Sequence, residues 1–388
     1  YWDGTKRSYY KNYYLFSFII LFFSILTFFM NEKIKEYSII TILALFFSIY
    51  IFESYLIFKP KASHLTDMNS KVIEYKKETG LDYDLRSKFE VYKDLKKKNK
   101  NIGTIVFWSN QMIDDMKKIG KFENIDKKIF PLSGLSKSEI LHCNENGYYS
   151  KYQSDRYGFN NPDEEWEKES FEYFLVGDSM THGACVNRPY DISSNLRVFS
   201  KKGVINLGQG TTGPLKMYAR LREYLEPNVK NIVWVHFEGN DFSDLNDELN
   251  SNFLIKYLDN KNFSQNLRYK QNIVNELSRA QIEIAEQIKF KNDSLKKNRA
   301  YNEKNLSYKI IRFVKFFETR NSIFIKKKNN YLIFEDILKQ TKILAQKNNS
   351  KLYFVFLFGE DIYNGLTDGQ KSLKRVEKIL NKLDIPFI

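Results

Sequence analysis

Cysteine, histidine, proline and glycine are all scarce in this sequence of 388 residues, which contains 2, 4, 7 and 17 of them respectively. Two cysteines cannot form a disulfide-rich scaffold or a four-cysteine zinc site. So few prolines and glycines exclude collagen-like and proline-rich chains. Hydrophobic residues make up 43% of the sequence, which is too much for a disordered chain. We therefore expect a folded protein, and no motif suggests a metal site or a cofactor.

The net charge is +14, from 61 Lys and Arg against 47 Asp and Glu. A charge of this sign is typical of nucleic-acid-binding proteins. The basic residues are spread along the chain, however, and no helix-turn-helix, zinc-finger or RRM signature accompanies them. The sequence is also rich in Lys, Asn, Ile, Tyr and Phe, whose codons are A/T-rich, so the lysine excess fits a codon bias. We therefore expect no nucleic-acid partner.

Two long apolar segments lie near the start of the sequence. Asn12–Asn31 contains no charged side chain, and Tyr37–Phe58 contains only Glu53. At about 1.5 Å per residue, each segment is long enough to span the roughly 30 Å hydrocarbon layer. Both are too long for the apolar region of a signal peptide, and no small-residue cleavage site follows. Residues 1–60 are therefore predicted to form a transmembrane helical hairpin that turns at Glu32–Glu36, making a two-pass protein of the cell (inner) membrane.

Two features bear on the side of the membrane that the rest of the chain occupies. Basic residues flank the hairpin at both ends, and the turn holds two lysines beside two glutamates. By the positive-inside rule this arrangement favours a cytoplasmic soluble part, by a small margin. A bond between Cys143 and Cys185 would instead imply an oxidising compartment. Two free buried thiols are the simpler expectation, and the side stays open.

Four short apolar runs farther along the chain have the character of buried strands. They are FEYFLV from Phe171, GVINL from Gly203, NIVWVHF from Asn231 and KLYFVFLF from Lys351. Helical patterns follow three of them, and this alternation indicates a doubly wound parallel α/β sheet. The long polar stretch before the fourth run predicts a helical insertion at about 248–348. Residues 61–168 are expected to form a helical and loop region ahead of an α/β domain at 169–388. Within the first of these regions, the apolar run Ile102–Trp108 predicts a strand.

A polar motif follows each of the first three strands, at the edge where doubly wound sheets place their sites. VGDSMTHG follows the first strand, NLGQGTTG the second and GND the third. Ser179 in the first motif would lie at a helix N-terminus, where backbone N–H groups favour developing negative charge. The glycine-rich second motif and the Asn240 amide would supply further donors to the same oxyanion.

In this order, on successive strand ends, the three motifs resemble blocks I, II and III of the SGNH/GDSL hydrolase family. The resemblance covers Phe171 to about Asp241 and resumes at Lys351–Ile388, and it implies a flavodoxin-like sheet of the SGNH hydrolase type. By position, Ser179 resembles the nucleophile and an oxyanion donor through its backbone N–H. Either Gly210 or the adjacent Thr211 matches the block II donor.

Further positions follow from the same resemblance. Asn240 resembles the block III asparagine, although Glu238 occupies the glycine position of that block and Gly239 comes one residue late. We place Asp178 and His182 at the substrate-binding side of the site, together with Thr211 if Gly210 is the donor.

The family's catalytic base is a histidine in a DxxH motif after the last strand. The sequence given ends at Ile388, within a run that resembles this strand, so we expect the motif farther along the gene. His182 lies three residues after Ser179 on the same predicted helix, but such local geometry rarely supplies both reach and an orienting partner. We therefore expect a packing or substrate-side role for His182. His236, inside the third strand, has an even chance of facing away from the site.

Together these features predict a membrane-anchored serine esterase or O-acyltransferase that acts through an acyl-serine intermediate. The substrate class rests on the loop YQSDRYGFNNPD, which resembles the stretch ahead of this domain in membrane-associated, glycan-modifying members. We therefore expect acyl esters of a glycan or glycolipid. The alternative is a catalytically inactive SGNH-like module that binds glycan or scaffolds an assembly. The two differ in whether an Asp and a His three residues apart follow the last strand.

Overall fold

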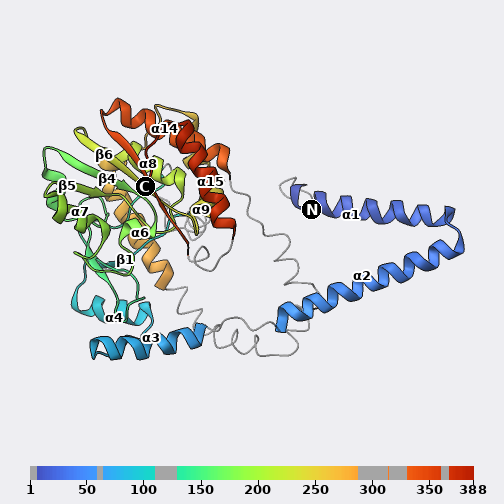
Figure 1. Ribbon diagram of the computed structural model, residues 1–388. Helices are drawn as coiled ribbons and strands as arrows, with labels where there is room; N and C mark the ends of the chain where they lie inside the picture. The colour runs from blue at the N-terminus through green and yellow to red at the C-terminus, as the bar shows by residue number, and fades with distance from the viewer. Residues whose placement is uncertain (1–6, 59–63, 110–128, 287–312, 314–329, 360–366) are drawn as a thin grey trace. The chain divides into compact units, whose positions relative to one another are not determined.

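The computed structural model describes residues 7–58, 64–109, 129–286, 313, 330–359 and 367–388 (Figure 1). The chain divides into two compact units. One consists of residues 1–62 and 296–326, and the other of residues 63–295 and 327–388. The first unit is built on two long helices and the second on a four-stranded sheet.

The first unit contains α1 (Arg7–Leu26), the short 3-10 helix η1 (Thr27–Phe29) and α2 (Glu32–Phe58). The predicted turn at Glu32–Glu36 is wrong, because these residues form the first turn of α2 and the break lies at Met30 and Asn31. The Asn31 side chain accepts the N–H of Ile34 at 3.0 Å and so caps α2. The local capping chemistry, rather than the charged residues, sets the position of the turn.

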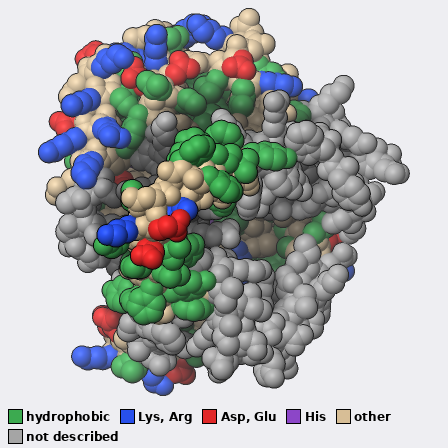
Figure 2. Space-filling model, turned by 90° about the vertical axis from the view of Figure 1, so that its right-hand side faces the viewer, with side chains coloured by type: hydrophobic (Ala, Val, Ile, Leu, Met, Phe, Trp, Pro, Cys, Tyr) green, Lys and Arg blue, Asp and Glu red, His purple; other side chains and the backbone are tan. Residues whose placement is uncertain are grey.

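Large apolar side chains on α1 and α2 are exposed, as Phe18 (65%) and Phe47 (70%) illustrate. Figure 2 views the end where the two helices meet and shows hydrophobic side chains on either side of a small charged group. Within the described residues one helix, Glu32–Leu56, is long and apolar enough to cross a membrane, whereas Ser17–Phe29 is a shorter apolar helix. By length and composition this one helix fits a membrane anchor, and a two-pass topology stays a prediction.

The second unit is organised around a parallel sheet with the strand order β5-β4-β6-β7. The strands are β4 (Phe171–Val176), β5 (Gly203–Asn206), β6 (Val229–Phe237) and β7 (Lys351–Leu357). Phe237 lies opposite Leu357 at the carboxyl end of the last pair, and Phe387 pairs with Phe354 beyond β7. The predicted α/β class with a parallel sheet is therefore confirmed. Because β4 lies between β5 and β6, the three polar motifs emerge side by side.

Helices pack on this sheet and enclose an apolar core (Figure 1). They include α7 (Ile192–Ser200), α8 (Pro214–Tyr224), α14 (Tyr331–Lys347) and α15 (Thr367–Lys382). Trp234, Phe334 and Phe354 are fully buried in one cluster. On α15, Val376 and Leu380 are also fully buried, which follows from their helical spacing of four residues. Burial of these rings and aliphatic chains fixes the sheet as a rigid platform for its strand-end loops.

Residues between β6 and α14 are largely helical where they are described. The elements are α9 (Asp241–Glu248), α10 (Asn252–Asp259), the 3-10 helix η3 (Leu267–Tyr269) and a helical stretch at 271–286. The remaining parts of the predicted insertion, 287–312 and 314–329, lie outside the described residues.

A small sheet and two helices precede β4. The elements are α3 (His64–Thr79), α4 (Lys88–Lys98), β1 (Ile102–Thr104), β2 (Glu139–Leu141), β3 (Lys151–Gln153) and the 3-10 helix η2 (Asp163–Glu167). β2 pairs in parallel with β1 and antiparallel with β3. The run Ile102–Trp108 predicts a longer strand than the one found. Pairing stops at Thr104, and the Trp108 indole donates instead to the carbonyl of Ser133 at 2.9 Å.

Candidate active site

Ser179 lies where β4 ends and the four-residue helix α6 (Ser179–His182) begins. The turn into this helix is tight, because a Cβ at Gly177 would lie 2.0 Å from the Thr181 hydroxyl oxygen. The helix ends at Gly183, whose φ of +78° lies in the left-handed region that favours glycine. Ser179 is half-buried, and its N–H belongs to the first helical turn, where the backbone offers no acceptor. Ser179 therefore offers both its hydroxyl and its backbone N–H at the start of this helix.

The buried Asp178 carboxylate connects the three strand-end motifs. Its Oδ1 accepts the N–H of Thr212 at 3.0 Å, and its Oδ2 accepts Nδ2 of Asn240 at 2.7 Å. The Ser179 hydroxyl lies 3.5 Å from the same Oδ2. Asp178, expected at the substrate side, thus holds the second and third motifs next to the serine. The three motifs meet around one side chain.

Asn240 is close to Ser179, but both of its amide hydrogens are engaged. One is donated to Asp178 and the other to Oδ2 of Asp244 at 2.9 Å. Burial, together with the nearby Asp178 charge, raises the pKa of Asp244 to about 7. Nothing in the sequence singled out Asp244, because in the chain it is one of several acidic residues on a helix.

The loop after β5 approaches the serine through its backbone. A Cβ at Gly208 would lie 2.7 Å from the backbone nitrogen of His182, so this position admits only glycine without a shift. A Cβ at Gly210 would lie 3.9 Å from Cβ of Ser179. The Gly210 N–H points to Nδ1 of His182 at 3.4 Å, and Thr211 follows with a φ of +57°. Of the two candidate oxyanion donors in this loop, the N–H of Gly210 is therefore already bonded to the side chain of His182.

Arg220 on α8 fixes the other side of the same loop. Its guanidinium donates to the Gln209 side chain at 2.8 Å and to the Thr212 hydroxyl at 2.9 Å. It also donates to the carbonyl of Leu132 at 2.6 Å. Burial lowers the pKa of Arg220 to about 10, which still leaves it charged at neutral pH. The sequence analysis missed this residue, since one arginine in a helical pattern carries no signal of its contacts.

Neither ring nitrogen of His182 bonds Ser179. Nδ1 accepts the Gly210 N–H, and Nε2 lies 3.0 Å from the Tyr152 hydroxyl. Burial lowers the pKa of His182 to about 3, so its ring is neutral. His236 is buried among four phenylalanine rings. In the described parts of the chain, no histidine bonds the Ser179 hydroxyl.

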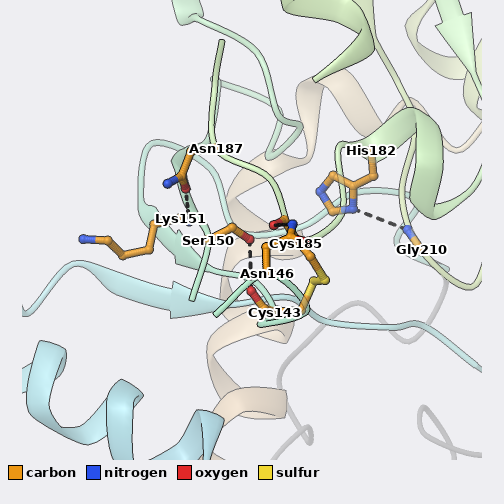
Figure 3. Close-up of a disulfide and its surroundings, with 8 residues drawn as sticks. All are labelled: Cys143, Asn146, Ser150, Lys151, His182, Cys185, Asn187 and Gly210. Atoms are coloured by element: carbon orange, nitrogen blue, oxygen red, sulfur yellow. Dashed lines mark hydrogen bonds between the residues drawn. A yellow bond between two sulfur atoms is a disulfide. The ribbon is translucent and has the colours of Figure 1, made fainter. Parts of the chain in front are cut away.

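Cys143 and Cys185 form a disulfide, so the expectation of two free thiols is wrong (Figure 3). Their Cα atoms are 4.8 Å apart although 42 positions separate them in sequence. The bond joins the loop between β2 and β3 to the segment that follows α6. In the same loop, Asn146 donates its side-chain amide to the carbonyl of Cys185 at 3.1 Å. The sequence could not show this pairing, because a spacing of this length says nothing about proximity.

A pocket of about 560 Å³ adjoins the loop after β5. Its lining includes the aromatic residues Phe107, Trp108 and Phe130 and the polar residues Thr211, Lys216, Asp244, Asp247 and Glu248. The Phe107 ring is 40% exposed, and it lies 3.1 Å from the position a Cβ would take on Gly210. The pocket thus combines an aromatic wall with carboxylates from α9. Within the described ranges, no cluster of three or more His, Cys, Asp or Glu side chains fits a metal ion.

Comparisons with known proteins add little to this description. No family model matches the sequence, and no curated protein matches it. Among solved structures, a mutant of the esterase AlinE4 is similar to 57% of this chain, over 76% of its own length. The TM-score is 0.29 and the sequence identity 9%. A TM-score this low does not define a common fold, so the function has to be argued from the residues of the chain itself.

Proposed function

We propose that this chain is a membrane-anchored serine esterase or O-acyltransferase of the SGNH type, with a flavodoxin-like sheet, acting on acyl esters of a glycan or glycolipid. The observation that carries the proposal is the convergence on Asp178. This one carboxylate binds Asn240 and Thr212 and lies beside Ser179. The three motifs that resemble SGNH blocks I to III therefore meet at the serine, as a hydrolase of this kind requires.

The proposed reaction has two steps. The Ser179 oxygen attacks the ester carbonyl, a C–O bond to the serine forms, and the bond to the alcohol breaks as the alcohol takes up a proton. Water or an acceptor hydroxyl then attacks the acyl-serine and releases the enzyme. Backbone N–H groups at Ser179 and in the loop after β5 stabilise the oxyanion. The general base that takes the serine proton is assigned to the DxxH motif that the resemblance predicts after the last strand.

The disulfide supports a location outside the cytoplasm for the second unit. A bond between Cys143 and Cys185 persists in oxidising compartments and is rare in the cytosol. This argument outweighs the positive-inside count, whose margin is small. A glycan or glycolipid substrate on the outer side of the membrane agrees with both the anchor and the disulfide.

The test uses the full-length protein and an activated acyl ester such as p-nitrophenyl acetate. Ser179→Ala should abolish turnover and labelling by a fluorophosphonate probe. Ser200→Ala is the matched control, because the Ser200 hydroxyl on α7 bonds only its own neighbours in the chain, the carbonyl of Leu196 and the N–H of Lys202, and this variant should keep both activities. Turnover that survives Ser179→Ala would overturn the assignment, and a folded wild type that neither turns over ester nor labels would favour the inactive module.

The same probe also tests the side of the membrane. A charged, impermeant fluorophosphonate should label intact cells as strongly as lysed cells if the second unit lies outside the cytoplasm. Labelling that appears only after lysis would place this unit in the cytoplasm.

A further inference from the structure

His182 is buried beside the loop after β5 and is bonded on both edges of its ring. Nδ1 receives the N–H of Gly210 at 3.4 Å, while Nε2 lies 3.0 Å from the hydroxyl of Tyr152 (Figure 3 shows the first of these). The carbonyl of His182 also accepts the Asn160 side-chain amide at 2.9 Å. The ring is therefore held at both nitrogens, and the backbone of the same residue is held by Asn160.

These contacts fix which nitrogen of His182 carries the proton. Burial favours the neutral ring, in which one nitrogen accepts and the other donates. Because a backbone N–H can only donate, Nδ1 must be the acceptor. Nε2 then carries the proton and donates it to the Tyr152 oxygen. His182 is thus a fixed acceptor aimed at the loop that faces Ser179.

Of three consecutive backbone N–H groups in this loop, two have hydrogen-bond acceptors within the chain. Gly210 donates to His182, and Thr212 donates to Asp178 at 3.0 Å. The N–H of Thr211, between them, has no partner among the described residues. Thr211 also lines the pocket that adjoins this loop. Since a backbone N–H seeks a partner, Thr211 is the amide that this loop leaves for a substrate oxygen.

We propose that His182 is a positioning residue: by accepting the N–H of Gly210 it orients the loop so that the N–H of Thr211 serves as the oxyanion donor. This inference rests on the proposed function, in which Ser179 attacks an acyl ester. It chooses between the two donors that the sequence left open. It also gives His182 a role that neither general-base chemistry nor simple packing describes.

The small sheet supports His182 from the other side. Tyr152 lies on β3, and the loop before that strand is tied to the segment after α6 by the disulfide (Figure 3). The N–H of Lys151 also donates to the Asn187 side chain at 2.8 Å. β3 and the segment after α6 are therefore linked by covalent and hydrogen bonds. Tyr152 is therefore held where its hydroxyl oxygen can accept the hydrogen bond from Nε2 of His182.

The experiment compares two substitutions in the full-length protein, each of which places a polar atom at one of the two ring-nitrogen positions. The side-chain oxygen of His182→Asn can take the place of Nδ1 and accept from Gly210, but it cannot reach Tyr152. His182→Gln reaches toward Tyr152 and leaves Gly210 without its acceptor. We expect kcat to fall by about 10²-fold for Gln and by no more than about threefold for Asn, with KM unchanged in both. Melting temperatures of the two variants verify that both are folded.

A second measurement does not depend on turnover. Hydrogen exchange at the Gly210 amide should be slow in the wild type and in His182→Asn but fast in His182→Gln. Equal losses of kcat in the two variants, or equal exchange at Gly210, would overturn the inference. Turnover that does not need Ser179 would overturn the proposed function instead, while the exchange data would still decide the role of His182.

Discussion

The two sides of the site around Ser179 use different kinds of hydrogen-bond acceptor, and burial shifts their pKa values in opposite directions. On the carboxylate side, Asp178 and Asp244 hold the Asn240 amide. On the histidine side, His182 holds the Gly210 N–H. Burial disfavours the charged form of both kinds of group, and it therefore raises the pKa of Asp244 to about 7 but lowers that of His182 to about 3.

This difference separates what pH can change in the site from what it cannot. The carboxylate side changes its charge close to neutral pH, because Asp244 titrates there. The histidine side stays neutral throughout that range and depends on geometry, which the small sheet and its disulfide maintain. Each side can therefore be broken by a different kind of perturbation.

Removal of the Asp178 carboxylate, which disrupts the carboxylate side, should have the largest effect of the three changes. Asp178→Ala leaves Thr212 and Asn240 without their common acceptor, so the second and third motifs lose their link to Ser179. We expect kcat to fall by about 10²-fold to 10³-fold, by analogy with the loss of an oxyanion donor. Steady-state kinetics on an activated ester would measure this loss of kcat.

Asp259→Ala, at an exposed carboxylate of α10, is the matched control and should have little effect on kcat. Activity close to that of the control would show that Asp178 does not organise the site.

Loss of the disulfide should have the next largest effect, and it acts on the histidine side. The double variant Cys143→Ser, Cys185→Ser opens a link across 42 positions. The loop-closure relation puts the cost at about 4 kcal/mol of unfolding free energy. Thermal and denaturant unfolding would measure it. Reducing agent should lower the stability of the wild type and leave that of the double variant unchanged. An equal response of the two proteins would mean that the bond does not stabilise this side.

Neutralisation of Asp244 should have the smallest effect, and it acts only on the carboxylate side. Its pKa is about 7 in the folded state against an ordinary 3.8. Between these values the folded state holds a proton that the unfolded state has lost, so stability falls as pH rises through this window. Asp244→Asn removes this contribution. The melting temperature of the variant should therefore fall less than that of the wild type between pH 5 and pH 8, values chosen to lie on either side of about 7.

Some of this pH dependence should remain in Asp244→Asn. Burial also raises the pKa of Glu248 to about 7, and this residue lies in the same part of the molecule. A variant whose pH profile matched that of the wild type would show that Asp244 is not the titrating group on this side.

The sequence predicted the main sheet more accurately than the small one. The run FEYFLV at Phe171–Val176 is a strand over its whole length, because a short buried apolar run in a parallel sheet has few other ways to satisfy its backbone. The run Ile102–Trp108 is also mostly apolar but pairs only as far as Thr104. Its continuation is decided by a tertiary contact between Trp108 and Ser133. Local apolar character could not distinguish these two outcomes.

The site shows the same division between local and distant information. Sequence motifs brought attention to Ser179, Gly210 and Asn240, which follow strands and are marked by glycine and polar residues. They gave no sign of Tyr152 or Arg220, whose roles come from the residues they contact. Even for Asn240 the motif indicated the position and not the state of the amide, since both of its hydrogens are held by carboxylates.

The sequence by itself therefore determined the strands of the main sheet, their polar ends and the apolar helix near the N-terminus, because each depends on residues close together in the chain. Only the tertiary structure decided that Cys143 and Cys185 pair and that Asp178 joins three motifs. It also decided that His182 turns toward Gly210 rather than Ser179. These contacts link residues 28 to 62 positions apart, and only the packing of the folded chain brings such residues within bonding distance.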